Sequence, residues 1–213
     1  MSTTLIKNAQ ALDCTGQHPF RADVLVDGNR IARINRVAGA SSAPMSAYGS
    51  AGQSAGNGSG IGSAATVVDA NGMTLMPGLI EAHAHPSFLN FERVEEVGEI
   101  PPEEHALATL KNVELMLNNG FTSLFCAASA RKLTDIIVRN AVNSGQFPGP
   151  RIMAASPELT PTAGLGDVNM DHMDRLSFAI VCDGADEFRK TARMMVREGA
   201  DVLKINPSGD EFV

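Results

Sequence analysis

Two histidines separated by one residue are the sharpest chemical feature of the chain. His83 and His85 follow an apolar run that begins at Pro77. On a β-strand, residues i and i+2 point to the same face, so both imidazoles project together from the end of a strand. Neutral imidazole nitrogens arranged in this way can bind one metal ion. We therefore predict a metal site at His83 and His85.

Lys204 is a second candidate, because it lies in the short apolar run 201–205. A protonated amine is a poor metal ligand, and burying it in the charged form is costly. A neutral amine can instead react with CO2 to give a carbamate, whose two oxygens are suited to bridging two cations. The spacing alone leaves another interpretation open, in which Lys204 extends from a strand end into solvent.

Strands and helices alternate along the chain after residue 66 and would position these side chains. Apolar runs predict strands at 67–70, 74–81, 121–127, 151–155 and 201–205, and helical periodicity predicts helices at 102–119, 132–144 and 186–198. In the first helix the predicted apolar face consists of Ala106, Leu107, Leu110, Val113 and Leu117. The alternation favours parallel βαβ units with right-handed crossovers. From residue 74 on, four strands and three helices make half of an eight-stranded barrel, whose sites assemble at the carboxyl ends of its strands.

The N-terminal region has a different pattern. A short strand at 4–9 and two alternating runs within 22–34, joined by Asp27-Gly28-Asn29, predict a small antiparallel sheet with a hairpin. Residues 38–66 consist mostly of Gly, Ser and Ala, which predicts a flexible insertion without chemistry of its own. We expect a β segment over 1–72 and the βα series over 73–213.

Residues 77–85, Pro-Gly-Leu-Ile-Glu-Ala-His-Ala-His, resemble the first-strand signature of the amidohydrolase superfamily, usually written Pro-Gly-Leu-Ile-Asp-x-His-x-His. Residues 149–152 and 199–205 resemble the third and fourth barrel strands of one branch. That branch contains Xaa-Pro dipeptidases, imidazolonepropionase-like proteins, and ochratoxin and phenylurea hydrolases. The resemblance implies a (β/α)8 TIM barrel, an α/β fold of which the first four strands are present. The preceding β segment resembles the N-terminal part of a small β-sandwich domain.

The resemblance also implies an activity, the hydrolysis of carbon–nitrogen bonds of amide, peptide, carbamate or urea type by a metal-activated water. It implies one or two divalent ions, with zinc the expected metal, bound by His83, His85 and a carboxylated Lys204, which has the catalytic role. Glu81 stands where the family more often has Asp, and would support the ligands. The expected substrate is a small, partly apolar amide or C-terminal dipeptide.

Other side chains are weaker candidates. Substrate contacts are predicted for His172, Asn206 and Ser208, and Asp210 is a further candidate at the end of the same strand as Asn206 and Ser208. His172 also fits a solvated loop. Cys126 is predicted to be a buried thiol. His18 and His105 are predicted to lie on the surface.

The family's remaining ligands and its general base have no counterpart in residues 1–213. They are two histidines from strands five and six and an aspartate from strand eight. We therefore expect this chain to be an N-terminal part, inactive by itself, that belongs to a homo-oligomer when complete. One alternative is a non-catalytic remnant or an assembly half that pairs with a complementary chain. Another is a metal-binding module unrelated to hydrolysis.

Composition narrows the choice of partners. The chain has 213 residues, with 17 basic and 24 acidic side chains and a net charge of −7, which disfavours nucleic acid as a partner. Its three cysteines form no Cys-x-x-Cys motif, so a reducing compartment, the cytoplasm, is expected. No apolar run approaches the roughly 20 residues of a membrane span, and no signal peptide is apparent.

Overall fold

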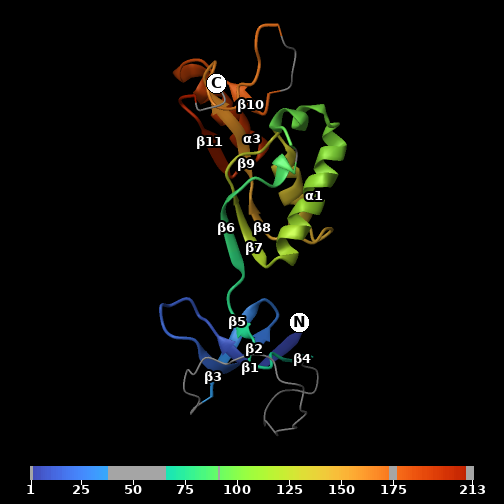
Figure 1. Ribbon diagram of the computed structural model, residues 1–213, viewed down its shortest axis with the longest axis vertical. Helices are drawn as coiled ribbons and strands as arrows, with labels where there is room; N and C mark the ends of the chain where they lie inside the picture. The colour runs from blue at the N-terminus through green and yellow to red at the C-terminus, as the bar shows by residue number, and fades with distance from the viewer. Residues whose placement is uncertain (1, 38–65, 91, 173–176, 210–213) are drawn as a thin grey trace. The chain divides into compact units, whose positions relative to one another are not determined.

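The computed structural model describes residues 2–37, 66–90, 92–172 and 177–209 (Figure 1). The chain divides into two compact units, Met1–Pro77 and Gly78–Val213, which are taken here in turn. The insertion predicted at 38–66 lies, except for Thr66, outside the described residues. None of the helices in the described part of the chain is long and apolar enough to cross a membrane.

The first unit is a β-sheet. Its strands are β1 (Thr3–Ala11), β2 (Phe20–Asp27), β3 (Arg30–Arg36), β4 (Thr66–Asp69) and β5 (Thr74–Leu75). They are ordered β3-β2-β1-β4, and β5 also pairs with β1. The predicted hairpin is confirmed, because Asp27 pairs with Arg30 across a turn at Gly28, whose φ is +58°. β1 is antiparallel to β2, and β4 and β5 are parallel to β1.

The second unit alternates strands and helices, as predicted (Figure 1). Its strands are β6 (Leu79–Ala84), β7 (Phe121–Cys126), β8 (Arg151–Met153), β9 (Ala155–Thr160), β10 (Ala179–Val181) and β11 (Val202–Ile205). Its α-helices are α1 (Pro102–Asn118), α2 (Thr134–Asn143) and α3 (Ala185–Glu198), and its 3-10 helices are η1 (Pro86–Phe88) and η2 (Val94–Glu99).

The strands of this unit form two parallel sheets, ordered β6-β7-β8 and β10-β9-β11. The parallel pairing agrees with the sequence prediction, but the described strands do not close into a barrel. The strand predicted at 151–155 extends to Thr160 and is interrupted at Ala154, so that β8 belongs to one sheet and β9 to the other. β10 was not predicted from the sequence.

The three α-helices begin and end within two residues of their predicted bounds. Pro102 occupies the first turn of α1, where the proline's missing N–H costs no hydrogen bond. α3 has Asp186 and Glu187 in its first turn and Arg197 in its last, in keeping with the helix dipole. Gly199 ends α3 in the left-handed conformation, with a φ of +100° that a side chain would disfavour.

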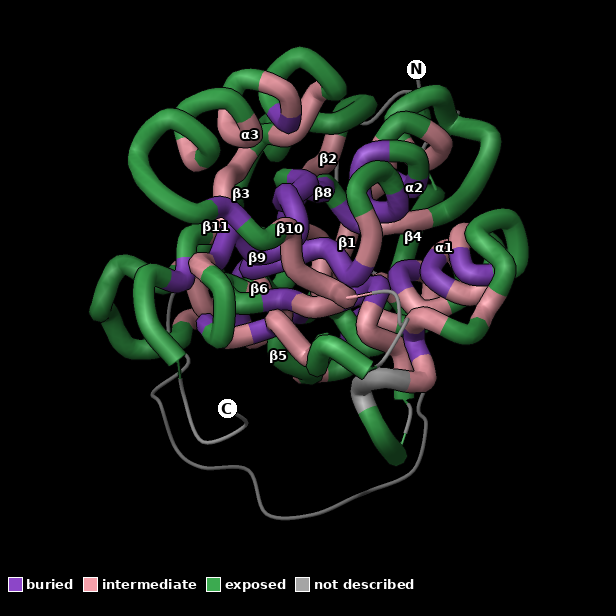
Figure 2. The backbone as a smooth tube through the Cα atoms, turned by 90° about the horizontal axis from the view of Figure 1, so that it is seen from above, coloured by how far each residue is buried: buried purple, intermediate pink, exposed green. Residues whose placement is uncertain are grey.

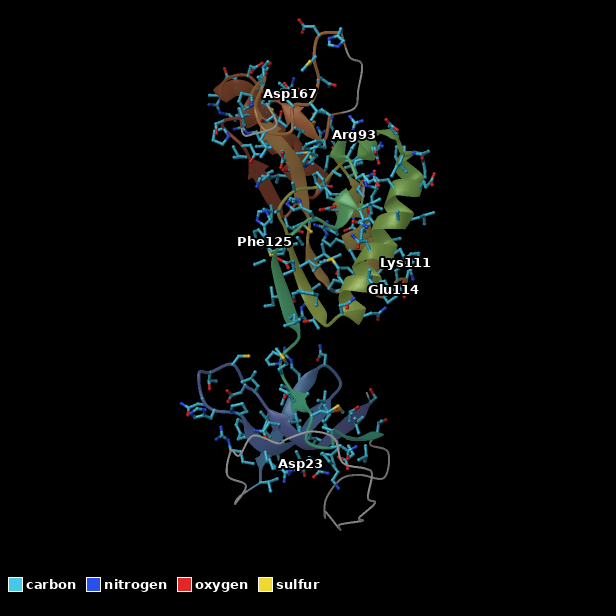
Figure 3. The ribbon with its side chains drawn as sticks, in the orientation of Figure 1. Asp23, Arg93, Lys111, Glu114, Phe125 and Asp167 are labelled. Carbon is cyan, nitrogen blue, oxygen red and sulfur yellow. The ribbon has the colours of Figure 1, made fainter. Side chains whose placement is uncertain are left out.

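The core of the second unit lies between the first sheet and helices α1 and α2. It consists of Ala84, Val113, Leu124, Cys126, Val138, Ile152 and Ala155. The predicted burial of Cys126 is thus confirmed. Figure 2 shows β9 buried along its whole length, whereas Phe125 of β7 is 40% exposed (Figure 3). Leu124 and Cys126, on either side of Phe125, are buried because alternate residues of a strand face opposite sides.

The buried face of α1 differs from the prediction. It carries His105, Thr109 and Val113, each one helical turn apart and fully buried, whereas Leu107 is 65% exposed. The prediction that His105 is a surface residue was wrong. Its ring can be buried because Nε2 lies 2.6 Å from the backbone carbonyl oxygen of Ser87, which satisfies the polar nitrogen.

Candidate metal centre

The predicted histidine pair lies at the carboxyl end of β6. His83 belongs to the strand and His85 follows it directly, before η1. Their ring centroids are 5.0 Å apart and the ring planes cross at 66°. Glu81 accepts a hydrogen bond from the backbone N–H of His83 through Oε1 at 3.0 Å. The carboxylate of Glu81 thus fixes the backbone that carries the first imidazole.

The surroundings of His85 favour its neutral form. Burial is the main cause that lowers the pKa of this imidazole, and the nearby charges of His83 and Lys204 lower it further. The backbone of Ala128 has the opposite effect. Nδ1 of His85 is buried and makes no direct hydrogen bond within the described ranges. A neutral imidazole is the form that binds a metal ion.

Lys204 lies on β11, in the other sheet of the unit. Its backbone N–H donates to Oγ of Ser156 at 3.1 Å, and it pairs in register with Glu158 of β9. Glu158 is 6% exposed. The charge of Lys204 is the smallest of the causes that lower the pKa of His85.

The predicted substrate residues are dispersed. His172 is exposed in a turn between β9 and β10. Asn206 follows Lys204 by two residues and is 9% exposed, and its Nδ2 has no direct hydrogen-bond partner among the residues that the structure describes. Ser208 is exposed, and its backbone carbonyl accepts a hydrogen bond from Leu165 at 3.2 Å. Asp210 lies outside the described residues, and His18 is exposed as predicted.

An aromatic contact beside the histidines was not predicted. The ring of Phe88 lies 5.1 Å from that of His85, and the ring of Phe178 lies 5.5 Å from that of Phe88, both nearly edge-to-face. The spacing of Phe88, three residues after His85, was a usable signal. Phe178 is remote in sequence, and no local pattern connects it to the histidines.

The donor set fits part of a divalent metal site. Two imidazoles are common ligands of zinc and similar ions, which in structural sites take four ligands and in catalytic sites three protein ligands and a water. Within the described residues, no cluster of three or more His, Cys, Asp or Glu side chains could hold an ion. His83 and His85 therefore supply two ligands, and a complete shell needs donors of another kind or from elsewhere.

A parallel α/β unit with paired imidazoles at the end of a strand places the chain in the class of α/β proteins whose sites assemble at the carboxyl ends of parallel strands. Within that class, the chain belongs to the amidohydrolase family, whose model matches residues 74–209. Members of this family generally use divalent metals. The resemblance noted at residues 77–85 is thus confirmed.

Individual relatives agree with this assignment. The ochratoxinase of Aspergillus niger is 28% identical over 109 residues, a match that covers 44% of this chain and 22% of that protein. A crystal structure of an amidohydrolase is 26% identical, with a TM-score of 0.73 over 96% of this chain and 46% of that chain. A Xaa-Pro dipeptidase with bound methionine in its active site has a TM-score of 0.71 at 24% identity, over 96% of this chain and 47% of that chain. The chain thus spans about half the length of these solved relatives.

Proposed function

We propose that this chain forms part of a metal-dependent hydrolase of carbon–nitrogen bonds in amide, peptide, carbamate or urea-type substrates. The observation that carries the proposal is the histidine pair at the end of β6, in a chain that belongs to the amidohydrolase family. His83 and His85 would hold a divalent ion, with zinc the expected metal. Such an ion lowers the pKa of a bound water and polarises a scissile carbonyl.

Lys204 is the further ligand in this proposal, as a carbamate that bridges two ions. The place of Lys204 near the carboxyl end of the parallel strand β11 supports this role. A carbamate supplies anionic oxygen donors, and the described cluster of imidazoles lacks such donors. An unmodified Lys204 would instead leave a site with one ion bound by the two histidines.

The proposed substrate is a small amide or peptide-like molecule. The similarity to an ochratoxinase and to a Xaa-Pro dipeptidase supports this class. Among the three proposed substrate residues, Asn206 has the best support, because its buried Nδ2 at the carboxyl end of β11 lacks a direct partner among the described residues. His172 and Ser208 are exposed and accessible to a substrate.

The proposed enzyme is larger than residues 1–213. The coverage of 46% of a related solved chain supports this view. Apolar side chains of several strands are exposed: Ile80 is 69%, Met153 46% and Ile205 53% exposed. Further strands and helices of a TIM barrel would cover such side chains. The complete enzyme would be a cytoplasmic homo-oligomer. The alternative is a non-catalytic remnant, or an assembly half that needs a complementary chain, and the same coverage supports it.

Metal content and hydrolysis test the proposal together. The chain is purified with whatever continuation its reading frame encodes, analysed for bound metal, and assayed on a panel of amides, dipeptides, carbamates and ureas. The matched variants are His83→Ala/His85→Ala and, as a control, His18→Ala, which removes an exposed imidazole of the first unit. We expect metal and activity in the native protein and in the control, and neither in the double variant.

Two results would change the conclusion. Equal metal content in all three proteins would overturn the metal site. Metal without hydrolysis of any substrate would favour the non-catalytic alternative. Labelling with carbon-13 bicarbonate, followed by NMR, reports whether Lys204 carries a carbamate, and loss of the signal in Lys204→Ala identifies the residue.

A further inference from the structure

The short turn η1 (Pro86–Phe88) follows the histidine pair directly and is fixed unusually well. Pro86 and Ser87 are fully buried. The N–H of Phe88 donates to the carbonyl of His85 at 3.2 Å. The backbone of this turn therefore determines the position of His85, which precedes it.

Helix α1 contacts two carbonyl groups of this turn. Nε2 of His105 lies 2.6 Å from the carbonyl oxygen of Ser87, and Nδ2 of Asn112 donates to the carbonyl oxygen of Pro86 at 2.7 Å. Since a carbonyl oxygen only accepts, Nε2 of His105 carries the proton. Burial lowers the pKa of His105, so the ring donates this bond as the neutral tautomer.

The loop and helix after β7 hold the same turn from a second direction. Oγ of Ser87 accepts a hydrogen bond from the N–H of Ala130 at 2.9 Å. The carboxyl group of Asp135, which is 1% exposed in the first turn of α2, lies close enough to the same hydroxyl for Ser87 to lower its pKa. The turn η1 is thus hydrogen-bonded to helix α1 and to the loop that precedes α2.

We propose that His105 and Asn112 are positioning residues for the metal centre, because they hold the turn that orients His85. The inference rests on the proposed function. Neither side chain touches the imidazoles of the pair among the contacts described here, so both act through the backbone of η1. Partners of this outer kind orient metal ligands, and their loss typically lowers metal affinity about 10- to 100-fold.

A purely structural role for His105 predicts something different. In that case, any loss of packing in α1 would have the same effect on metal binding. Val113 provides the matched control, since it is fully buried in the core two turns further along α1 and its apolar side chain makes no hydrogen bond to η1. His105→Gln retains an N–H donor in place of Nε2, whereas His105→Leu removes it.

The experiment measures zinc affinity by competition with a chromophoric chelator, and the visible spectrum of the cobalt-substituted protein. We expect His105→Leu to bind zinc about 10- to 100-fold more weakly with an altered cobalt spectrum. His105→Gln should recover most of the affinity, and Val113→Ala should unfold more easily with unchanged affinity. Hydrogen exchange of the Phe88 amide in the metal-free protein should accelerate in His105→Leu and not in Val113→Ala.

The outcomes separate the two proposals. A native protein that binds no zinc overturns the metal site, whereas the exchange of the Phe88 amide still tests the effect of His105 on the turn. Equal zinc affinity in His105→Leu and the native protein overturns the inference alone. If His105→Leu does not fold, Asn112→Ala removes the half-buried second donor, and unchanged affinity and Phe88 exchange in that variant overturn the inference.

Discussion

Asp135 makes the stability of the protein depend on pH in a direction opposite to that of most carboxylates. Burial raises its pKa from 3.8 to about 6, although the neighbouring side chains of Ser87, Ser129 and Cys126 act in the opposite direction. The folded state therefore retains a proton that the unfolded chain releases. The stabilisation that comes from retaining this proton on Asp135 is fully present below pH 3.8 and is lost as the pH rises through about 6.

The size of the effect follows from the two pKa values. At about 1.4 kcal/mol for each pH unit between them, the contribution amounts to about 3 kcal/mol. Asp135→Asn has nearly the same shape and does not titrate. We therefore expect the unfolding free energy of the native protein, relative to this variant, to fall by about 2.4 kcal/mol between pH 4 and pH 7, because the unfolded carboxyl is already partly ionised at pH 4.

Urea unfolding of both proteins over this pH range measures the difference. Other titrating groups contribute to both proteins and cancel. A difference between the native protein and Asp135→Asn that stays constant within about 0.5 kcal/mol would refute the reasoning from burial.

Two further predictions concern the second unit and the cysteines. Asp201→Ala should lower the unfolding free energy by about 2 kcal/mol, because Oδ2 of Asp201 accepts from Arg139 at 2.5 Å and from the N–H of Ala154 at 2.8 Å; urea unfolding that gives no loss contradicts this. Cys14 is exposed and should react at once with a thiol reagent, whereas the buried Cys126, whose pKa burial raises, should react only on unfolding. A single rate for both thiols would contradict that expectation.

Strong periodicity and turn residues made much of the fold predictable. α1 begins at the predicted Pro102, and the hairpin around Gly28 forms where Asp-Gly favours it. β10 was missed because three residues are too few to show alternation, and its pairing with β9 is a long-range contact. The break at Ala154 was missed for a similar reason, since it depends on which strands pair on either side.

Prediction of the candidate site was limited in the same way. The proximity of His83 and His85 followed from the strand period alone, and the contact between their rings agrees with it. The burial of His105 could not be derived from an apolar pattern. A polar ring is buried only where it has a hydrogen-bond acceptor, which here is the carbonyl oxygen of Ser87. A stripe of polar and apolar residues at positions 105, 109 and 113 was the available signal.

The break at Ala154 affects how the distances between metal ligands are set. His83 and His85 belong to the β6-β7-β8 sheet, and Lys204 to the β10-β9-β11 sheet. The backbone of Ala154 bonds to residues at the start of β11: its carbonyl accepts from Asp201 at 2.8 Å and from Val202 at 3.2 Å. A change of backbone direction at Ala154 would shift the lysine relative to the imidazoles while leaving the hydrogen bonds within each sheet intact. The spacing of the proposed ligands would therefore depend on a position that carries no ligand itself.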